Sequence, residues 1–244
     1  MANFILIHGS WCGKWVWQPI IPLLEQNGHK VIAPDLPGSG EDTTPVSDVT
    51  MELYVDDITQ LIIEKDLQDI ILVGHSMGGM IISAVAEKLP NKITTLVYLT
   101  AIVPSSGKSF VDIMKLQPPS KIELEFTEDN AIVSVKPHVM SYVFCNNCTA
   151  QDIGFITSMC QPTASIISVT PVILTNDNYG RVPRIFIECT NDNAIFIALQ
   201  RMMIANHGIV KIYSLDADHF PTFSAPVPLG NALNDIALAT EKAS

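Results

Sequence analysis

The chain has 244 residues, enough for one α/β domain with a sizeable core, and its composition is 48% hydrophobic and 16% charged. That balance excludes a disordered or fibrous chain and is typical of a protein built on a buried parallel sheet. The formal net charge of −11 comes from 14 basic and 25 acidic residues, so we expect neither a nucleic acid nor an anionic membrane surface as a partner.

Targeting signals and metal-binding patterns are weak. The apolar run Phe4–Ile7 is only as long as a strand and no basic region precedes it, so we expect no signal peptide. No stretch reaches the length of a membrane span, and five cysteines, an odd count, favour reduced thiols in a cytoplasmic protein. Cys145 and Cys148 have the spacing of half a zinc site without a second ligand pair, so neither a metal nor an organic cofactor is expected.

Short apolar runs alternate with helix-compatible stretches along most of the chain, which predicts a parallel sheet with right-handed crossovers. The first helix contains Pro19, which predicts a kink or a late start. In chain order we expect strand 4–7, helix 15–27, strand 30–33, helix 51–65, strand 70–73, helix 80–89, strand 93–99, strand 184–189, helix 197–206, strand 210–214 and helix 228–240.

The alternation stops after Pro104. Residues 105–182 contain several prolines and scattered polar clusters, with no clear succession of strands and helices. We interpret this segment as an inserted lid of short helices with a small strand pair, and residues 1–104 and 183–244 as the core domain.

The chain is organised around Gly74-His75-Ser76-Met77-Gly78, which lies between a predicted strand and a predicted helix. Strand, sharp turn and helix are the context in which Gly-x-Ser-x-Gly acts as a nucleophile elbow. The turn strains the serine backbone and leaves no room for bulky residues two positions away on either side, a demand that the two glycines meet. Ser76 is therefore the predicted nucleophile, with the positive end of the following helix beneath it.

A serine hydroxyl is a weak nucleophile and needs a base, which in turn needs a carboxylate to orient it. His219 follows the last predicted strand in a loop, where the chain order nucleophile, acid, histidine puts the base. Asp192 is the carboxylate directly after the fifth predicted strand, whereas the loop after the fourth begins with Thr100 and holds no acid. Asp216 and Asp218 are interpreted as turn formers, because close neighbours in sequence seldom face each other correctly for a side-chain bond.

The negative charge that develops on an attacked carbonyl needs two backbone N–H donors. The residue after the nucleophile, Met77, is predicted to supply one of them. The loop after the first strand is predicted to supply the other through Ser10, because Gly9 permits a close approach. All these residues follow predicted strands, and function in parallel sheets gathers at the carboxyl ends of the strands.

Six stretches of the chain carry a family resemblance: Phe4–Trp15, Asp35–Gly40, Gly74–Gly79, Tyr142–Asp152, Arg181–Ile195 and Asp216–Pro226. In these stretches the chain resembles the plant methyl-ester esterase and hydroxynitrile lyase family of α/β-hydrolases, in particular its bacterial esterase-like branch. The resemblance implies an α/β-hydrolase fold, with a mostly parallel six-stranded sheet flanked by helices and an inserted, mainly helical lid. It also implies Ser76, Asp192 and His219 as the catalytic triad.

The same resemblance separates ester hydrolysis from cyanohydrin cleavage. The lyases of this group are understood to use a threonine in the first loop and a lysine directly after the catalytic histidine. Those positions are Gly9 and Phe220 here, so no ammonium group is available to stabilise a departing cyanide. The resemblance therefore implies a serine esterase that cleaves alkyl or methyl esters of small, apolar acids through an acyl-enzyme.

Aromatic residues of the lid are candidate walls of an acyl pocket, although simple packing against the core explains each of them as well: Phe110, Phe126, Tyr142, Phe144 and Phe155. Trp11 and Trp15 are candidates for the mouth of the pocket. Gly9 and Phe220 are candidate pocket residues beside the reacting groups.

Other functions stay open at this point. The first is a hydroxynitrile lyase-like enzyme that cleaves a C–C bond, and the second is a non-catalytic small-molecule binding protein on the same fold. The third is a hydrolase of an amide or a lactone, because a triad does not by itself distinguish these bonds. The expected partner is a small-molecule ester, and a homodimer is compatible with the sequence.

Overall fold

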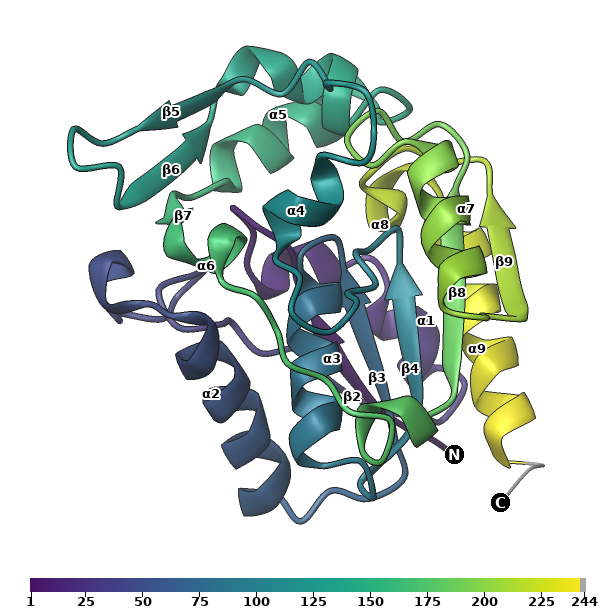
Figure 1. Cartoon of the computed structure of the whole chain (residues 1–244). Coiled ribbons are helices and arrows are strands. Elements are labelled where there is room, and N and C mark those ends of the chain that lie inside the picture. The colour runs from purple at the N-terminus through teal and green to yellow at the C-terminus, as the bar shows by residue number, and fades with distance from the viewer. Residues whose placement is uncertain (242–244) are drawn as a thin grey trace.

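A computed structural model describes residues 1–241 and contains the predicted six-stranded sheet (Figure 1). Neighbouring strands are parallel throughout, in the order β2-β1-β3-β4-β8-β9. The strands are β1 Asn3–Ile7, β2 Lys30–Ile32, β3 Ile70–His75, β4 Ile93–Leu99, β8 Arg184–Cys189 and β9 Lys211–Leu215. The parallel sheet predicted from alternating apolar runs and helices is therefore confirmed.

Helices cover both faces of this sheet. They are α1 Ile21–Glu25, α2 Met51–Glu64, α3 Gly78–Lys88, α7 Ile197–Asn206, α8 Pro221–Ser224 and α9 Pro226–Glu241. Side chains alternate along a strand, so in β1 Ile5 and Ile7 join an apolar cluster with α2, α3 and α7, whereas Phe4 and Leu6 join one with α1 and α9. Figure 1 shows α2 and α3 on the first face and α9 on the second. None of the described helices is long and apolar enough to cross a bilayer.

The predicted helix at 15–27 is present but shorter than expected, and it starts late, as Pro19 predicted. The chain forms a short 3-10 helix, Lys14–Trp17, and resumes only at α1, which has Pro22 in its first turn. A continuous helix would need N–H groups at Pro19 and Pro22, which proline lacks, and each ring would meet the carbonyl one turn earlier. A proline is tolerated in the first turn of a helix, which is where Pro22 lies.

Residues 105–169 lie across the carboxyl ends of the strands, and residues 170–182 run back to the amino ends, where β8 begins (Figure 1). They hold a three-stranded antiparallel sheet, where a strand pair was predicted, because residues 163–164 add a third strand to the hairpin. The strands are β5 Leu124–Phe126, β6 Ile132–Val135 and β7 Thr163–Ala164. The helices are α4 Phe110–Met114, α5 Ala150–Met159, α6 Ile166–Val169 and an irregular π-helix, Met140–Phe144. We call residues 105–182 the cap segment.

Candidate active site

Ser76 lies in the sharp turn between β3 and α3, and its φ of 56° is in the left-handed region. At Gly74 and Gly78, two residues away on either side, any side chain would clash with the neighbouring backbone. A Cβ at Gly74 would lie 2.7 Å from the carbonyl of Gly78, and a Cβ at Gly78 would lie 2.9 Å from the carbonyl oxygen of Ile7. The backbone thus fixes the serine in a strained conformation at the end of a buried strand.

The structure brings together Ser76, His219 and Asp192, although they come from three loops far apart in the sequence. His219 Nδ1 lies 2.7 Å from Asp192 Oδ2, and His219 Nε2 lies 3.0 Å from Ser76 Oγ. An ionised carboxylate only accepts, so Nδ1 carries the proton and Nε2 is left to accept from the serine hydroxyl. This is the tautomer that a general base for Ser76 requires.

The Asp192 carboxylate is satisfied on both of its oxygens. Oδ1 accepts from the backbone N–H groups of Ala194 and Ile195 at 2.7 and 2.9 Å, while Oδ2 accepts from His219 and, at 2.5 Å, from Thr100 Oγ1. Its side chain is fully buried, so these donors replace water around the charge. The sequence analysis noted only that the loop beginning with Thr100, directly after β4, holds no acid. It missed the role of Thr100 as a hydrogen-bond donor to Asp192.

The two predicted oxyanion donors, Ser10 and Met77, belong to segments that meet at Ser76. A Cβ at Gly9 would lie 2.8 Å from Ser76 Cβ, which shows how closely the first loop approaches the serine. Ser10 Oγ donates to Met77 Sδ at 3.3 Å and so ties this loop to the elbow. Among the described residues, no hydrogen bond recorded in the structure uses the backbone N–H of Ser10 or Met77, so both are free to bind a ligand oxygen.

Two buried histidines support the loops that carry these groups. His8 Nε2 accepts from the Leu36 N–H at 3.1 Å, so His8 Nδ1 donates to the Gly9 carbonyl at 2.9 Å. His75 Nε2 donates to the His219 carbonyl at 2.7 Å. Burial lowers the pKa of His8, and burial, reinforced by the nearby His219, lowers the pKa of His75 well below its usual value. Both rings are therefore uncharged at neutral pH and hold these loops in place through hydrogen bonds.

Asp218 does more than form a turn. Its Oδ1 accepts from the Phe220 N–H at 3.0 Å, the turn that the sequence predicts, and also from Ser224 Oγ at 2.7 Å. Its Oδ2 accepts from the Asn147 N–H at 2.7 Å and lies 3.4 Å from Cys148 Sγ. The completely buried Asp218 therefore joins the His219 loop to the cap segment, a link that the sequence analysis missed.

Two cavities adjoin the reacting groups. The larger, which we call the catalytic chamber, has a volume of about 530 Å³ and is lined by Ser76, His219 and predicted pocket residues Trp11, Phe110 and Phe144. The smaller, which we call the small cavity, has a volume of about 10 Å³ and is lined by the same Ser76 and His219 together with Phe220. Its lining is otherwise mostly apolar, and it has room for about one water-sized group.

The other predicted pocket residues lie elsewhere. Phe126 lines a further cavity that Ser76 does not reach. Tyr142 is 39% exposed with its ring near His138, and Phe155 packs edge-on against Trp15. Trp15 itself is buried beside Phe155 and is not at a pocket mouth, because its short helix packs against the sheet core.

Within residues 1–241, no group of three or more His, Cys, Asp or Glu side chains is arranged to hold a metal ion. Cys145 and Cys148 are free thiols, and Cys148 faces Asp218. The hydrogen bond with Cys145, burial and the nearby Asp218 raise the pKa of the Cys148 thiol, so the free thiol is protonated at neutral pH.

Comparisons with known proteins identify the family of this chain. A family model described as "Alpha/beta hydrolase family" matches residues 4–230. Methylesterase 1 of Arabidopsis thaliana is 33% identical, with 96% of this chain and 95% of the relative covered. Salicylic acid-binding protein 2 of Nicotiana tabacum is 30% identical, with 96% of each chain covered. The crystal structure of a pyrethroid hydrolase from Sphingobium faniae JZ-2 is 28% identical and superposes with a TM-score of 0.85 over 99% of each chain.

Proposed function

The chain belongs to the α/β-hydrolase family, and within it to the plant methylesterase family, and we propose that it hydrolyses carboxylic esters through an acyl-enzyme on Ser76. The observation that carries the proposal is the chain of hydrogen bonds from Ser76 Oγ through His219 to Asp192. A cytoplasmic location is part of the proposal, supported by five free cysteines.

In the proposed mechanism His219 Nε2 takes the proton of Ser76 as Oγ attacks the ester carbonyl. The N–H groups of Ser10 and Met77 stabilise the oxyanion, and Asp192 holds the imidazolium that forms. The tetrahedral intermediate then collapses, the C–O bond to the alcohol breaks, and His219 returns its proton to the leaving oxygen. Water repeats the same steps on the acyl-enzyme and releases the acid and the free serine.

Two other functions on this fold predict different behaviour. Cyanohydrin cleavage is disfavoured because Phe220, which follows His219, is a buried aromatic residue that cannot stabilise cyanide, and Gly9 has no hydroxyl. A binding protein is the second candidate, suggested by the name of the tobacco relative. The complete hydrogen-bonded Ser76–His219–Asp192 arrangement favours the enzyme over the binding protein.

The test is release of acid from methyl esters of unbranched acids by the wild type and by Ser76→Ala, together with labelling by a fluorophosphonate probe. We expect the variant to lose about a thousandfold or more of kcat and all labelling, because the nucleophile is gone. A wild type that neither releases acid nor reacts with the probe would reject the esterase and favour the binding protein. Cleavage of a cyanohydrin such as mandelonitrile, measured in parallel, would favour the lyase.

A further inference from the structure

Trp11 directly follows Ser10, the proposed oxyanion donor, and its backbone has a conformation that a bulky residue rarely adopts. Its φ of 61° lies in the left-handed region, where the side chain of any residue other than glycine crowds the backbone. Such a conformation persists only where the surrounding structure holds it, and it is found mainly at functional sites. Contacts from outside the loop must therefore hold Trp11 in place.

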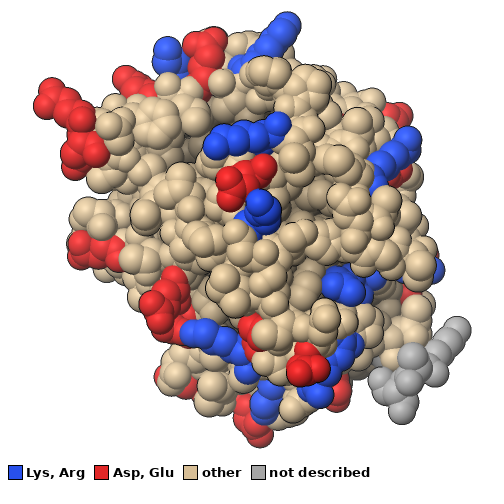
Figure 2. All heavy atoms as spheres, in the orientation of Figure 1, with Lys and Arg blue, Asp and Glu red and all other residues tan. Residues whose placement is uncertain are grey.

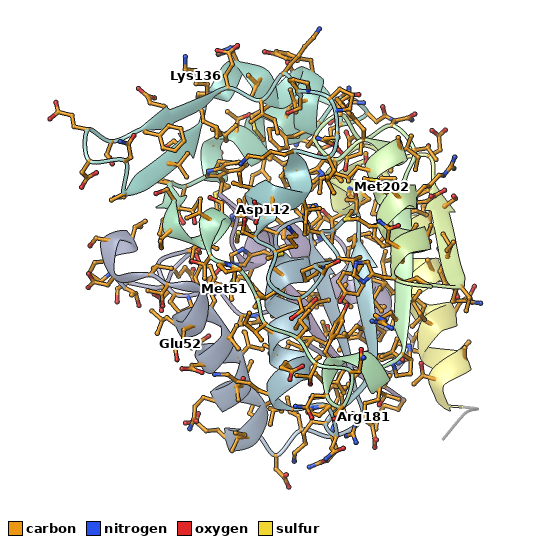
Figure 3. The ribbon with its side chains drawn as sticks, in the orientation of Figure 1. Met51, Glu52, Asp112, Lys136, Arg181 and Met202 are labelled. Atoms are coloured by element: carbon orange, nitrogen blue, oxygen red, sulfur yellow. The ribbon has the colours of Figure 1, made fainter. Side chains whose placement is uncertain are left out.

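Three contacts attach Trp11 to the cap segment. Its indole Nε1 donates to the Val133 carbonyl of β6 at 3.2 Å, and its own carbonyl accepts from the Gln161 N–H at 2.9 Å. Its ring meets the Phe144 ring edge-on, with 6.0 Å between the centroids. Figure 3 shows Lys136, the residue that follows β6, on the outer side of the cap segment. The partners of Trp11 thus come from three separate parts of the cap segment, which together hold both its ring and its backbone.

Ion pairs do not hold the cap segment against the core. Among the ion pairs recorded between described side chains, none joins residues 105–182 to the rest of the chain. Figure 2 shows that the surface over α6 and β7 is mostly uncharged. Directional links at the site come from hydrogen bonds instead: Asp218 joins the His219 loop to the cap segment, and Trp11 joins the Ser10 loop to it.

The angle at Trp11 affects the direction of the Ser10 N–H because two planar peptide units meet at Ser10. The unit before it contains the Gly9 carbonyl and the Ser10 N–H, and His8 Nδ1 holds that carbonyl through one hydrogen bond of 2.9 Å. The unit after it ends at the nitrogen of Trp11, so φ of Trp11 decides how this unit is turned. A single hydrogen bond leaves the first unit free to pivot, and the second unit supplies the other anchor.

Resting on the esterase function proposed above, we propose that Trp11 is a positioning residue through which the cap segment directs the Ser10 N–H at the oxyanion. Without the indole, a residue other than glycine relaxes to a negative φ and turns the donor away. Acylation and deacylation both pass through an oxyanion, so kcat falls whichever step is slower. Trp11 also lines the small cavity and the catalytic chamber, and the loss of that wall changes KM.

The test separates these two roles by comparing Trp11→Ala with Trp11→Gly. Both variants lose the indole, so KM for methyl butanoate should change alike, but only glycine adopts a φ of 61° without strain. We expect kcat to fall about 20-fold in the alanine variant and only about two- to threefold in the glycine variant. Trp11→Phe keeps a ring and loses the hydrogen bond to Val133, so it should lose several-fold of kcat with little change in KM.

Asp69 provides the matched control. Its φ of 50° is also left-handed, and it is an exposed residue that lines none of the described cavities. Asp69→Gly should melt at a higher temperature than Asp69→Ala for the same backbone reason, while kcat of both stays within about twofold of wild type. Steady-state kinetics and melting temperatures of the five variants provide the measurement.

Several results would overturn this proposal. If Trp11 only forms a wall, the alanine and glycine variants have equal kcat, and if the loop only needs stiffness, the glycine variant is the slower one. Either result, a Trp11→Phe variant with wild-type kcat, or the same kcat difference in the Asp69 pair rejects the positioning role and leaves the esterase function standing. No hydrolysis and no probe labelling by the wild type would reject both proposals. If melting shows that Trp11→Ala does not fold, the kinetics of Trp11→Phe decide.

Discussion

The carboxyl ends of the sheet and the cap segment that lies across them are built differently. Ser76, Asp192 and His219 follow strands of the sheet and are 8%, 3% and 3% exposed, and hydrogen bonds hold each of them. The cap residues that line a neighbouring cavity of about 310 Å³ are less buried, since Phe126 and Val169 are 49% and 54% exposed. The groups proposed to react are thus fixed, while the cap segment is a smaller and more exposed unit.

This contrast separates two kinds of mutational effect. Changes around the sheet ends should alter the proton transfers and hence kcat for every ester, because those groups touch the reacting atoms or their direct supports. Changes in those cap residues that line the catalytic chamber away from His219 should alter which ester is preferred, because these side chains do not contact the reacting groups. The following experiments test this division.

The largest effect, apart from the loss of Ser76 itself, is expected for Thr100→Val. The change removes the hydroxyl that donates to Asp192 Oδ2, the same oxygen that accepts from His219 Nδ1, while it keeps the branched shape. We expect kcat to fall about 10- to 100-fold for all esters with a small change in KM, because the base is less well oriented.

The control for Thr100→Val is Thr59→Val. The Thr59 hydroxyl in α2 is buried without a hydrogen-bond partner, so its loss should leave activity unchanged and not lower the melting temperature. Steady-state kinetics of both variants with one short and one long methyl ester provide the measurement. Activity of Thr100→Val within about twofold of wild type would show that Asp192 needs no second donor on that oxygen.

Asp218→Asn should affect both stability and catalysis, because Asp218 joins the His219 loop to the cap segment. An asparagine keeps the shape but turns one oxygen into a donor, so either the Phe220 and Ser224 pair or the Asn147 contact loses its acceptor. We expect the free energy of unfolding to drop by about 2 kcal/mol and kcat by about tenfold, because the His219 loop is less firmly held.

Denaturant unfolding and kinetics measure these two effects. Asp216→Asn is the matched control, since Asp216 is exposed and bonds only the Asn191 side chain, and we expect changes of less than about 0.5 kcal/mol there. Equal effects of the two substitutions would contradict the bridging role of Asp218.

Acid pH should weaken the sheet-end region through His75. Burial holds the pKa of His75 well below its usual value, so the native ring stays neutral while the unfolded ring protonates below about pH 6.5. The unfolded state then binds more protons, and stability falls as the pH drops below about 6.5, by up to about 1.4 kcal/mol per pH unit for this group. Unfolding free energies between neutral and mildly acidic pH should show a shallower decline in His75→Gln, and an unchanged decline would contradict this origin.

The smallest effect is expected for Tyr142→Ala. Tyr142 faces His138 at the surface, so we expect activity within about twofold of wild type for every ester. Phe144→Ala, two residues later, is the comparison, because the Phe144 ring lines the catalytic chamber and lies 5.5 Å from the His219 ring. The same kinetic assay should show a loss of several-fold or more in that variant, and equal activities would contradict the placement of the two rings.

Much of the candidate site follows from local sequence and from a single topological rule. The glycines around Ser76 are needed by the turn itself, and the carboxyl ends of parallel strands lie along one edge, so loops after β1, β3, β8 and β9 had to meet. Together with the chain order nucleophile, acid, histidine, that rule predicted that His219 and Asp192 lie beside Ser76. The late start of the first helix was predicted from Pro19, whereas the short 3-10 helix before it was not.

By itself, therefore, the sequence determined the parallel sheet, the elbow and the order of the reacting groups, because these depend on periodicity, turn chemistry and chain order. Only the tertiary structure decided that Thr100 donates to Asp192, 92 residues away, and that Asp218 binds Asn147, 71 residues away. It also decided that Phe144 and not Tyr142 lines the catalytic chamber. In an irregular cap, which side chain points inward depends on the segments that pack around it, and no short-range pattern records that contact.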